Sequence, residues 1–276
     1  MILPPRLGVT TILAFGDSIT EGEVPVVGEF ALRPHYVQAG SAYPAHLATL
    51  LAQRYTEQGA SRIDAFAIGP TNLGNDCTNT NPPRPTTSGI VVINAGCLGE
   101  PAESTTQCAQ DGTCARDRLI GKIAIYHPDL VLLLEGTNDL SADPLRAGAS
   151  ISAGVTGVRG LIAAAQSSGA RVLVGTLLPE IAADLTHGGA PDQVVPFNAQ
   201  LVPAVLSSGA SIVDLYSDIV QDQTDWISPL DGLHPTEAGY REMARVWFNS
   251  IQKAFELAST TTSVKTPGTR ISARRQ

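Results

Sequence analysis

The sequence predicts an α/β domain with a mainly parallel sheet. Short runs of apolar and β-branched residues alternate with longer segments in which apolar residues recur at helical spacing, and this alternation is typical of α/β domains. The chain has 276 residues, of which 43% are hydrophobic, so it is long enough and apolar enough to bury a full core. Charged residues make up only 16%, which argues against long disordered charged segments or coiled coils.

Several apolar runs have the length expected of strands. Leu130–Glu135 is a continuous apolar run of the kind found in strands that are covered on both faces. The other strand candidates are Thr10–Phe15, Ile63–Ile68, Ile90–Asn94, Arg171–Leu177 and Ser211–Leu215.

Helical periodicity is clearest between the strand candidates. Gly59 ends the first of these segments, and Thr236 is a plausible start of the last. The predicted helices are Ala42–Gln58, Ala147–Ser168, Pro196–Ser207 and Thr236–Leu257.

Composition divides the chain into one domain and a tail. We expect a single domain over residues 1–258, in which residues 69–89, rich in Pro, Asn and Thr, form a surface insertion. Residues 259–276 turn to Thr, Ser, Lys, Arg and Pro, which predicts a flexible C-terminal tail.

Charge and hydropathy exclude several classes of partner. The formal net charge is −8, whereas a general electrostatic grip on nucleic acid needs clustered Lys and Arg. The longest purely apolar run, Leu130 to Leu134, is too short to span a bilayer. We therefore expect a monomer that binds a small molecule, without nucleic acid, a membrane span or a cofactor.

Four cysteines, Cys77, Cys97, Cys108 and Cys114, allow three disulfide pairings. The last two flank a short polar loop that could close as a disulfide, and none of the spacings matches a zinc site. The cysteines, the polar insertion and the polar tail favour an exported protein, periplasmic or extracellular, whose signal segment is not part of this sequence. A cytoplasmic location is also compatible with the sequence.

Reactive groups of a parallel sheet are expected in the loops that leave the carboxyl ends of its strands. Ser18 follows the first strand directly, where it is either a helix N-cap or a nucleophile. Asp231 and His234 lie just before the last helix, and a tight turn there would bring the carboxylate onto one imidazole nitrogen. The same Asp-x-x-His pattern also occurs in plain turns. His187, in a Gly-rich loop, is the rival base, whereas His127 precedes a strand and belongs to the opposite edge.

Two further segments occupy the same edge. Asn138 follows the strongest strand, so its amide could donate to a developing oxyanion, although Gly and Asn also make ordinary turns. Residues 94–99 follow another strand, and glycines there can turn backbone N–H groups toward a ligand.

Taken in order, Gly16-Asp17-Ser18, Asn94–Gly99, Gly136–Asp139 and Asp231–His234 resemble the four sequence blocks of the SGNH, or GDSL, hydrolase family. The resemblance implies a flavodoxin-like, doubly wound, three-layer α/β/α fold with a mainly parallel five-stranded sheet, and ester hydrolysis without a metal. It also implies the roles of individual residues: Ser18 as nucleophile, His234 as general base, Asp231 as orienting acid, and Gly99 and Asn138 as oxyanion donors.

We therefore expect a serine ester hydrolase that works through an acyl-enzyme intermediate. An aromatic content of 5% and the lack of an amphipathic lid helix favour small or short-chain acyl esters, including carbohydrate O-acetyl groups. An acyltransferase, or a lipase or lysophospholipase, would use the same triad, and analysis of products with a sugar acceptor separates the transferase. A non-catalytic ligand-binding module is the alternative of another class, and it would lack a reactive serine.

Overall fold

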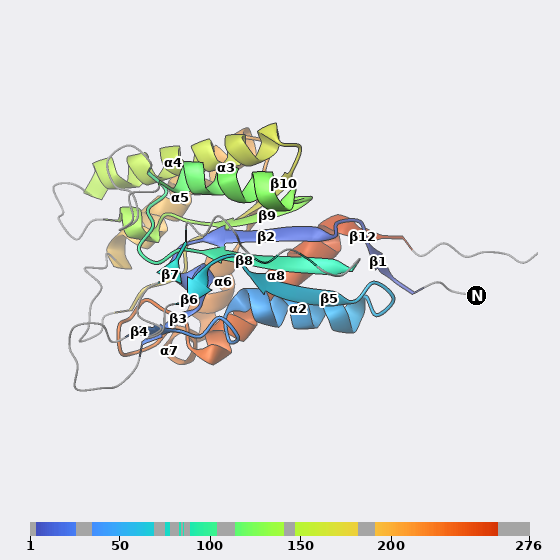
Figure 1. Ribbon diagram of the computed structural model, residues 1–276. Coiled ribbons are helices and arrows are strands. Elements are labelled where there is room, and N and C mark those ends of the chain that lie inside the picture. The colour runs from blue at the N-terminus through green and yellow to red at the C-terminus, as the bar shows by residue number, and fades with distance from the viewer. Residues whose placement is uncertain are drawn as a thin grey trace, which may run out of the picture.

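A computed structural model describes residues 4–25, 35–68, 75–77, 83, 85, 89–103, 114–140, 147–181 and 191–258. Its centre is a six-stranded sheet in which neighbouring strands run parallel (Figure 1). In spatial order its strands are β11 (Ser211–Val213), β10 (Arg171–Gly175), β9 (Leu130–Leu134), β2 (Thr11–Gly16), β8 (Ile90–Gly96) and β5 (Ala60–Asp64).

Five of these strands have the order of a flavodoxin-like sheet. Numbered along the chain without β5, the order β8-β2-β9-β10-β11 reads 2-1-3-4-5. The sheet differs from the expected five strands because β5 adds a sixth beyond β8. All residues of β5 are half-buried, which is typical of an edge strand, and they do not form an apolar run. The predicted strand Ile63–Ile68 is thus displaced, and its end forms β6 (Ala67–Ile68), which pairs antiparallel with β7 (Asn75–Asp76).

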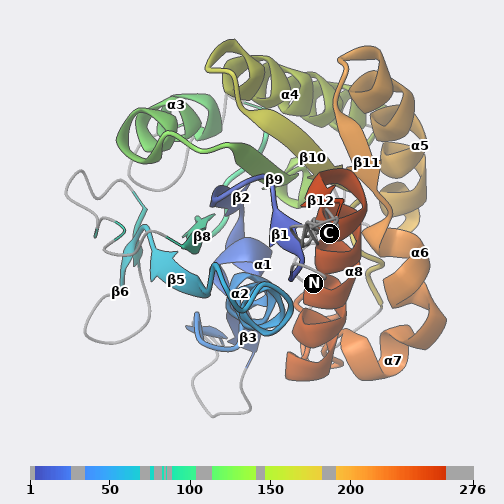
Figure 2. The same ribbon diagram turned by 90° about the vertical axis from the view of Figure 1, so that its right-hand side faces the viewer.

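Helices cover both faces of the sheet, and this three-layer arrangement confirms the predicted fold class. In Figures 1 and 2, α3, α4 and α5 lie over one face, and α2 and α8 lie over the other. Their bounds are α2 (Tyr43–Arg54), α3 (Ala115–Tyr126), α4 (Ala147–Ser167), α5 (Pro191–Ser207) and α8 (Glu237–Phe255).

Two helices differ from the sequence-based expectation. Helix α3 was not predicted, because its buried face includes Arg118 and Lys122, which interrupt the apolar periodicity. Helix α5 starts at Pro191 instead of Pro196, and it contains Pro196 and Pro203 inside the helix. Proline is unfavourable in a helix interior, so sequence reasoning placed the helix start too late.

The core lies between these layers. Every residue of β9 is buried, as expected for a central strand covered on both faces. On one face, the rings of Tyr43 in α2 and Trp247 in α8 stack with their centroids 6.1 Å apart, and both side chains are fully buried. The apolar face of α8 continues through Tyr240, Met243 and Ile251, which follow helical spacing.

Short elements complete the description. Antiparallel ribbons are formed by β3 (Glu23–Pro25) with β4 (His35–Val37), and by β1 (Arg6–Leu7) with β12 (Glu256–Leu257). The short helices are α1 (Ser18–Glu21), η1 (Thr137–Asp139), α6 (Leu215–Ile219), η2 (Val220–Asp222) and α7 (Gln223–Trp226).

A disulfide joins Cys77 to Cys97, with their Cα atoms 5.5 Å apart. It ties the expected insertion, of which only residues 75–77, 83, 85 and 89 are described, to the segment that follows β8. Three predicted features lie outside the described residues: Cys108 with the loop that follows it, His187, and the tail 259–276. Cys114 itself is described.

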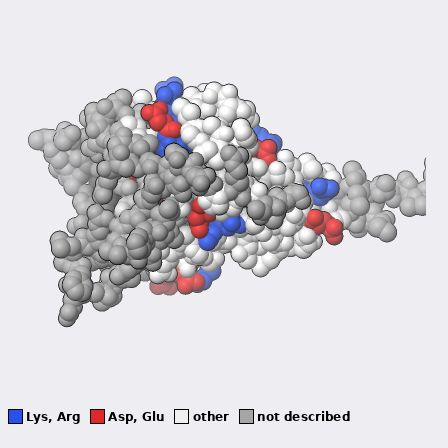
Figure 3. All heavy atoms as spheres, in the orientation of Figure 1, with Lys and Arg blue, Asp and Glu red and all other residues white. Residues whose placement is uncertain are grey.

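In the described part of the chain, no helix is both long and apolar enough to cross a membrane. The face drawn in Figure 3 carries its described acidic and basic side chains in small mixed groups. Ion pairs such as Arg54 with Glu256 and Arg245 with Glu242 account for this mixing of charge at the described surface.

Candidate active site

The candidate site lies where the central strands end. In Figure 1 the arrow of β2 points to this edge, and the loops after β2, β8 and β9 carry Ser18, Gly99 and Asn138 respectively. The chain passes from β2 to β8 on one side and continues to β9 on the other, so this is the topological switch point at which ligands bind in doubly wound sheets.

Ser18 is the first residue of α1. Asp17 caps this helix, because its Oδ1 accepts a hydrogen bond of 2.9 Å from the backbone N–H of Ile19. A capping role had been the alternative for the serine, but the structure gives that role to the aspartate. The hydroxyl of Ser18 is consequently not used for capping.

Three side chains form a hydrogen-bonded line. Oγ of Ser18 lies 2.8 Å from Nε2 of His234, and Nδ1 of His234 lies 2.6 Å from Oδ2 of Asp231. The other carboxylate oxygen of Asp231 accepts the backbone N–H groups of Leu233 and His234, both at 3.1 Å. All three side chains of the line are buried, so water competes little for these contacts.

The loop that carries Asp231 and His234 is held from several directions. Its backbone is bonded to Ser228, which donates to the carbonyl of His234 at 2.9 Å, and to Ile181, which donates to Gly232 at 2.8 Å. Thr236 then caps α8 by accepting from the N–H of Gly239. His234 is therefore positioned by the start of a long, packed helix.

Gly99 and Asn138 lie in the segments that follow β8 and β9. Gly99 has φ +69° and is exposed, and no oxygen of the described residues accepts its N–H. The N–H of Gly96, in contrast, donates to Oδ1 of Asn94 at 3.1 Å. Of the two glycines in this segment, Gly99 is thus the one whose N–H is available to a ligand.

The Asn138 amide is held by its neighbours. Its Nδ2 donates to the carbonyl oxygen of Glu100 at 3.0 Å and lies 3.4 Å from Oδ2 of Asp17. Asp139 accepts the N–H groups of Ala102 and Glu103 at 2.7 and 2.8 Å. These bonds join the segment after β8 to the turn after β9.

A buried arginine in α3 holds the segment that follows β8. Nε of Arg118 in α3 donates to both carboxylate oxygens of Glu100, at 2.8 and 3.0 Å. The same guanidinium donates to the carbonyls of Ala95 and Gly16 and lies 3.9 Å from the centroid of the Phe15 ring. One cation therefore links the ends of β2 and β8 to the start of the Gly99 loop.

Burial dominates the electrostatics of this edge. It raises the pKa of Asp17 to about 7, against the hydrogen bond from Ile19, and that of Asp139 to about 6. Glu135, directly after β9, has a pKa well above its usual value because of burial and the nearby Glu100 and Asp17 carboxylates.

The imidazole of His234 behaves differently. Burial would lower its pKa, but hydrogen bonds with Asp231 and Glu23, together with their charges, raise it to about 10. For Asp231, burial is outweighed by its bonds with His234, and its pKa is lowered. The ring therefore holds its proton strongly.

The structure brings together Ser18, His234 and Asp231, and it places Gly99 and Asn138 in the adjoining loops at the same edge. His127 ends α3 at the opposite edge with φ +48°, and the rival His187 lies outside the described residues. Sequence reasoning missed Glu23 and Arg118. No local signal marked either residue, since Arg118 itself interrupts the apolar periodicity of α3.

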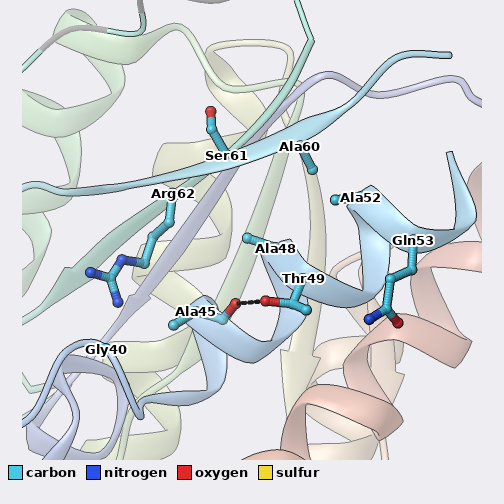
Figure 4. A pocket seen from close by; sticks show the side chains of 9 residues that line it. All are labelled: Gly40, Ala45, Ala48, Thr49, Ala52, Gln53, Ala60, Ser61 and Arg62. Atoms are coloured by element: carbon cyan, nitrogen blue, oxygen red, sulfur yellow. Dashed lines mark hydrogen bonds between the residues drawn. The ribbon is translucent and has the colours of Figure 1, made fainter. Parts of the chain in front are cut away.

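A groove outside this site offers less chemistry. It has a volume of about 610 Å³ and lies between α2 and β5 (Figure 4). Its lining is mostly small, with Thr49 bonded to the carbonyl of Ala45 and with Arg62 as its charged side chain. Across the described ranges, no three His, Cys, Asp or Glu side chains are grouped so that they could hold a metal ion.

Comparison with known proteins agrees with this geometry. The model of the GDSL-like Lipase/Acylhydrolase family matches residues 79–242, more than half of the chain. No curated protein sequence matches the chain significantly.

Solved structures share the fold. Est24, a carbohydrate acetylesterase from Sinorhizobium meliloti, has a TM-score of 0.62 and 14% identity over 89% of this chain and 100% of its own. The aryl esterase of M. smegmatis has a TM-score of 0.58 and 21% identity, over 88% and 99%. Axe2, an acetylxylan esterase from Geobacillus stearothermophilus, has a TM-score of 0.55 and 19% identity, over 89% and 96%.

The family match includes Gly99, Asn138, Asp231 and His234, whereas Ser18 lies before its first residue. The chain therefore belongs to the GDSL-like lipase/acylhydrolase family and is a carboxylic ester hydrolase.

Proposed function

We propose that this hydrolase cleaves small or short-chain acyl esters, including O-acetyl groups on carbohydrates, through an acyl-enzyme on Ser18. The observation that carries the proposal is the line from Asp231 through His234 to Ser18, with contacts of 2.6 and 2.8 Å. A serine hydroxyl becomes a nucleophile when a base within hydrogen-bond reach removes its proton, and this line supplies such a base.

In the proposed reaction, Nε2 of His234 takes the proton of Ser18 as Oγ attacks the ester carbonyl carbon. The C=O bond becomes a single C–O⁻ bond, and the same nitrogen then returns the proton to the departing alcohol oxygen. Asp231 holds the ring orientation and stabilises the imidazolium. Water, deprotonated by His234, releases the acyl group and restores Ser18.

The negative oxygen of the intermediate needs fixed donors. The N–H of Gly99 and the Asn138 amide support this role. One amide hydrogen is bonded to the Glu100 carbonyl at 3.0 Å, and the other makes only a long bond of 3.4 Å to Asp17, which the oxyanion would replace. The backbone N–H of Ser18, at the start of α1, is the third proposed donor. The amide is pre-positioned, which reduces the reorganisation needed during the reaction.

Acetyl specificity is supported by the names of structural neighbours, two of which act on acetylated carbohydrates. A series of p-nitrophenyl esters from acetate to palmitate, assayed at pH 8 and pH 10 beside Ser18→Ala, tests the proposal. We expect hydrolysis of the short esters and of an acetylated xylo-oligosaccharide, and no hydrolysis by Ser18→Ala. Activity that survives in folded Ser18→Ala, or that rises with chain length, contradicts it.

We also propose that the protein is exported. The disulfide between Cys77 and Cys97 supports this location, because disulfides persist in oxidising compartments. Fractionation of cells that make the full natural protein tests it, and recovery in the cytoplasm alone contradicts it.

A further inference from the structure

Glu23 is a buried carboxylate that the reaction above does not use. It is the first residue of β3 and follows the nucleophile's helix by one residue, Gly22. The hydroxyl of Tyr240 in α8 donates to its carbonyl oxygen at 2.7 Å, and the N–H of Gln38 donates to the carbonyl of Gly22 at 2.8 Å. The backbone at Glu23 is therefore held from both sides, and its side chain is 7% exposed.

The Glu23 carboxylate faces the reactive nitrogen of the base. Its Oε2 lies 3.3 Å from Nε2 of His234, the atom that is also 2.8 Å from Oγ of Ser18. Asp231 lies 2.6 Å from the ring's other nitrogen. The imidazole thus has a carboxylate at each nitrogen, whereas a Ser-His-Asp triad needs only one.

This geometry favours the ring that carries two protons. An imidazolium donates from Nδ1 to Asp231 and places its positive charge 3.3 Å from the Glu23 oxygen, so both carboxylates gain an opposite charge. In the neutral ring, the lone pair of Nε2 faces the negative Glu23 oxygen, and the charge-assisted contact is lost. The neutral ring is the one that can accept the proton of Ser18.

The other described groups around the ring act in the same direction as Glu23 or are neutral. The carboxyls that act on the ring's charge are Glu23 in β3, Asp231 in its own loop and Asp17 after β2. The phenol of Tyr240 in α8 lies beside Glu23, to whose carbonyl it donates. These are three carboxyls and a phenol whose pKa is raised well above its ordinary value by burial. Each of them disfavours loss of the ring's proton or is neutral to it.

We propose that Glu23 is a positioning residue that keeps Nε2 of His234 protonated until the solution becomes alkaline, so that rising pH switches the esterase on. The proposal rests on the proposed role of His234 as the base. The raised pKa of His234, about 10, agrees with the geometry: burial opposes the shift, and bonds with Asp231 and Glu23 produce it.

The first test is a pH profile of kcat/KM for the wild type and Glu23→Gln, between pH 5 and pH 10.5. Hydrolysis of a short-chain ester is followed in a pH-stat, so that the readout does not depend on a chromophore's ionisation. We expect the acidic limb of Glu23→Gln to move down by about one to two pH units, since an opposite charge at this distance shifts a pKa by that amount. At pH 7 the variant should then be about tenfold or more faster than the wild type.

Glu135→Gln is the matched control. Glu135 is also a buried carboxyl at this edge, but its described ion pair is with Arg118, 4.0 Å away, and not with His234, so an amide of the same shape should leave the limb in place. Glu23→Asp keeps the charge on a shorter side chain and should give an intermediate limb. An unmoved limb in Glu23→Gln overturns the proposal, as does a folded Glu23→Gln protein that is inactive at every pH.

A second readout needs no activity. The ring nitrogens of His234 are titrated by NMR in ¹⁵N-histidine-labelled Ser18→Ala and in Ser18→Ala with Glu23→Gln, or with Glu23→Asp if the amide variant does not fold. We expect a midpoint well above pH 7 in the first protein and a lower one in the second. Equal midpoints overturn the proposal. If Ser18→Ala retains esterase activity, the proposed function fails, while this titration still reports on Glu23.

Discussion

Asp129 and Asp17 lie next to neighbouring strands at opposite edges of one sheet, and their environments differ. At the amino edge, Oδ2 of Asp129 accepts the N–H and hydroxyl of Thr10 and the N–H of Thr11, at 2.8 to 3.0 Å. These bonds outweigh its partial burial and lower its pKa. At the carboxyl edge, burial raises the pKa of Asp17 to about 7 in spite of one backbone hydrogen bond.

The difference between these two pKa shifts indicates which edge of the sheet contributes stability to the fold and which edge reduces it. A carboxylate that is well solvated and bonded to strand N–H groups stabilises the folded state. Buried carboxyls with raised pKa values disfavour it, and they gather where chemistry is expected. The described carboxyls of this edge whose pKa is raised are Asp17, Glu135 and Asp139.

The largest expected effect separates the histidines of the two edges. Changing His234 to Ala removes the proposed base and should lower kcat/KM on a short ester by about 10⁴-fold or more. His127→Asn at the amino edge is the matched control, because Asn tolerates the positive φ of that position. It should retain activity, and so should His187→Ala. A loss below about tenfold in His234→Ala would contradict the assignment of the base.

The next largest effect should distinguish the side-chain amides of two asparagines, Asn138 and Asn198. Asn138→Ala should lower kcat by about 10²–10³-fold, because an oxyanion donor is lost. The amide of Asn198 is instead bonded to the N–H and carbonyl of Leu177, at 2.8 and 3.0 Å. Asn198→Ala should therefore lower the melting temperature and leave kcat nearly unchanged. Steady-state kinetics and thermal unfolding distinguish the two, and a loss of only about two- to threefold in Asn138→Ala would remove it from the oxyanion site.

A stability effect should appear at the amino edge. Asp129→Ala leaves the N–H groups of Thr10 and Thr11 without their carboxylate partner and should lower the free energy of unfolding by about 1 kcal/mol. Because the folded pKa of Asp129 is lowered, its contribution is present above the unfolded pKa and is lost as pH falls through the folded value. Urea unfolding at pH 7 and pH 3 measures this, and an equal loss at both pH values would contradict it. Esterase activity should not change.

The smallest expected effect has the opposite sign. The folded pKa of Glu135 is raised, so above its unfolded pKa the unfolded chain releases a proton that the folded chain keeps, and stability falls as pH rises. Glu135→Gln has no such proton. Its melting temperature relative to the wild type should therefore increase between pH 4 and pH 8. A difference in melting temperature that stays constant with pH would contradict the raised pKa of Glu135.

Much of the fold and of the candidate site could be predicted from local sequence. The run of β9 is apolar throughout, because both of its faces are covered. Short motifs directly after strands marked Ser18 and Asn138, and a motif just before the last helix marked Asp231 and His234. Parallel strands bring such motifs to one edge, so their order along the chain was enough to place them together. The family was recognised from the same four segments.

Elements whose burial depends on distant partners were misplaced, like β5, or missed, like α3. The edge strand β5 has no apolar run, since it is half-exposed and pairs only with β8. Helix α3 carries Arg118 on its buried face, and that charge is tolerated because Glu100 and two strand-end carbonyls receive it. Neither feature is visible in a local window of sequence.

Local sequence thus specifies which residues follow which strand, because turn, cap and strand preferences act over a few residues. Tertiary packing settles which buried groups meet: Cys77 with Cys97, Arg118 with Glu100, and Glu23 with His234, which is 211 positions further along the chain (234 − 23). Such contacts are created when separate elements pack, and their energies depend on burial and on neighbouring charges. For that reason Ser18, Asp231 and His234 were predictable from sequence motifs. The contact of Glu23 with His234 became visible only in the tertiary structure.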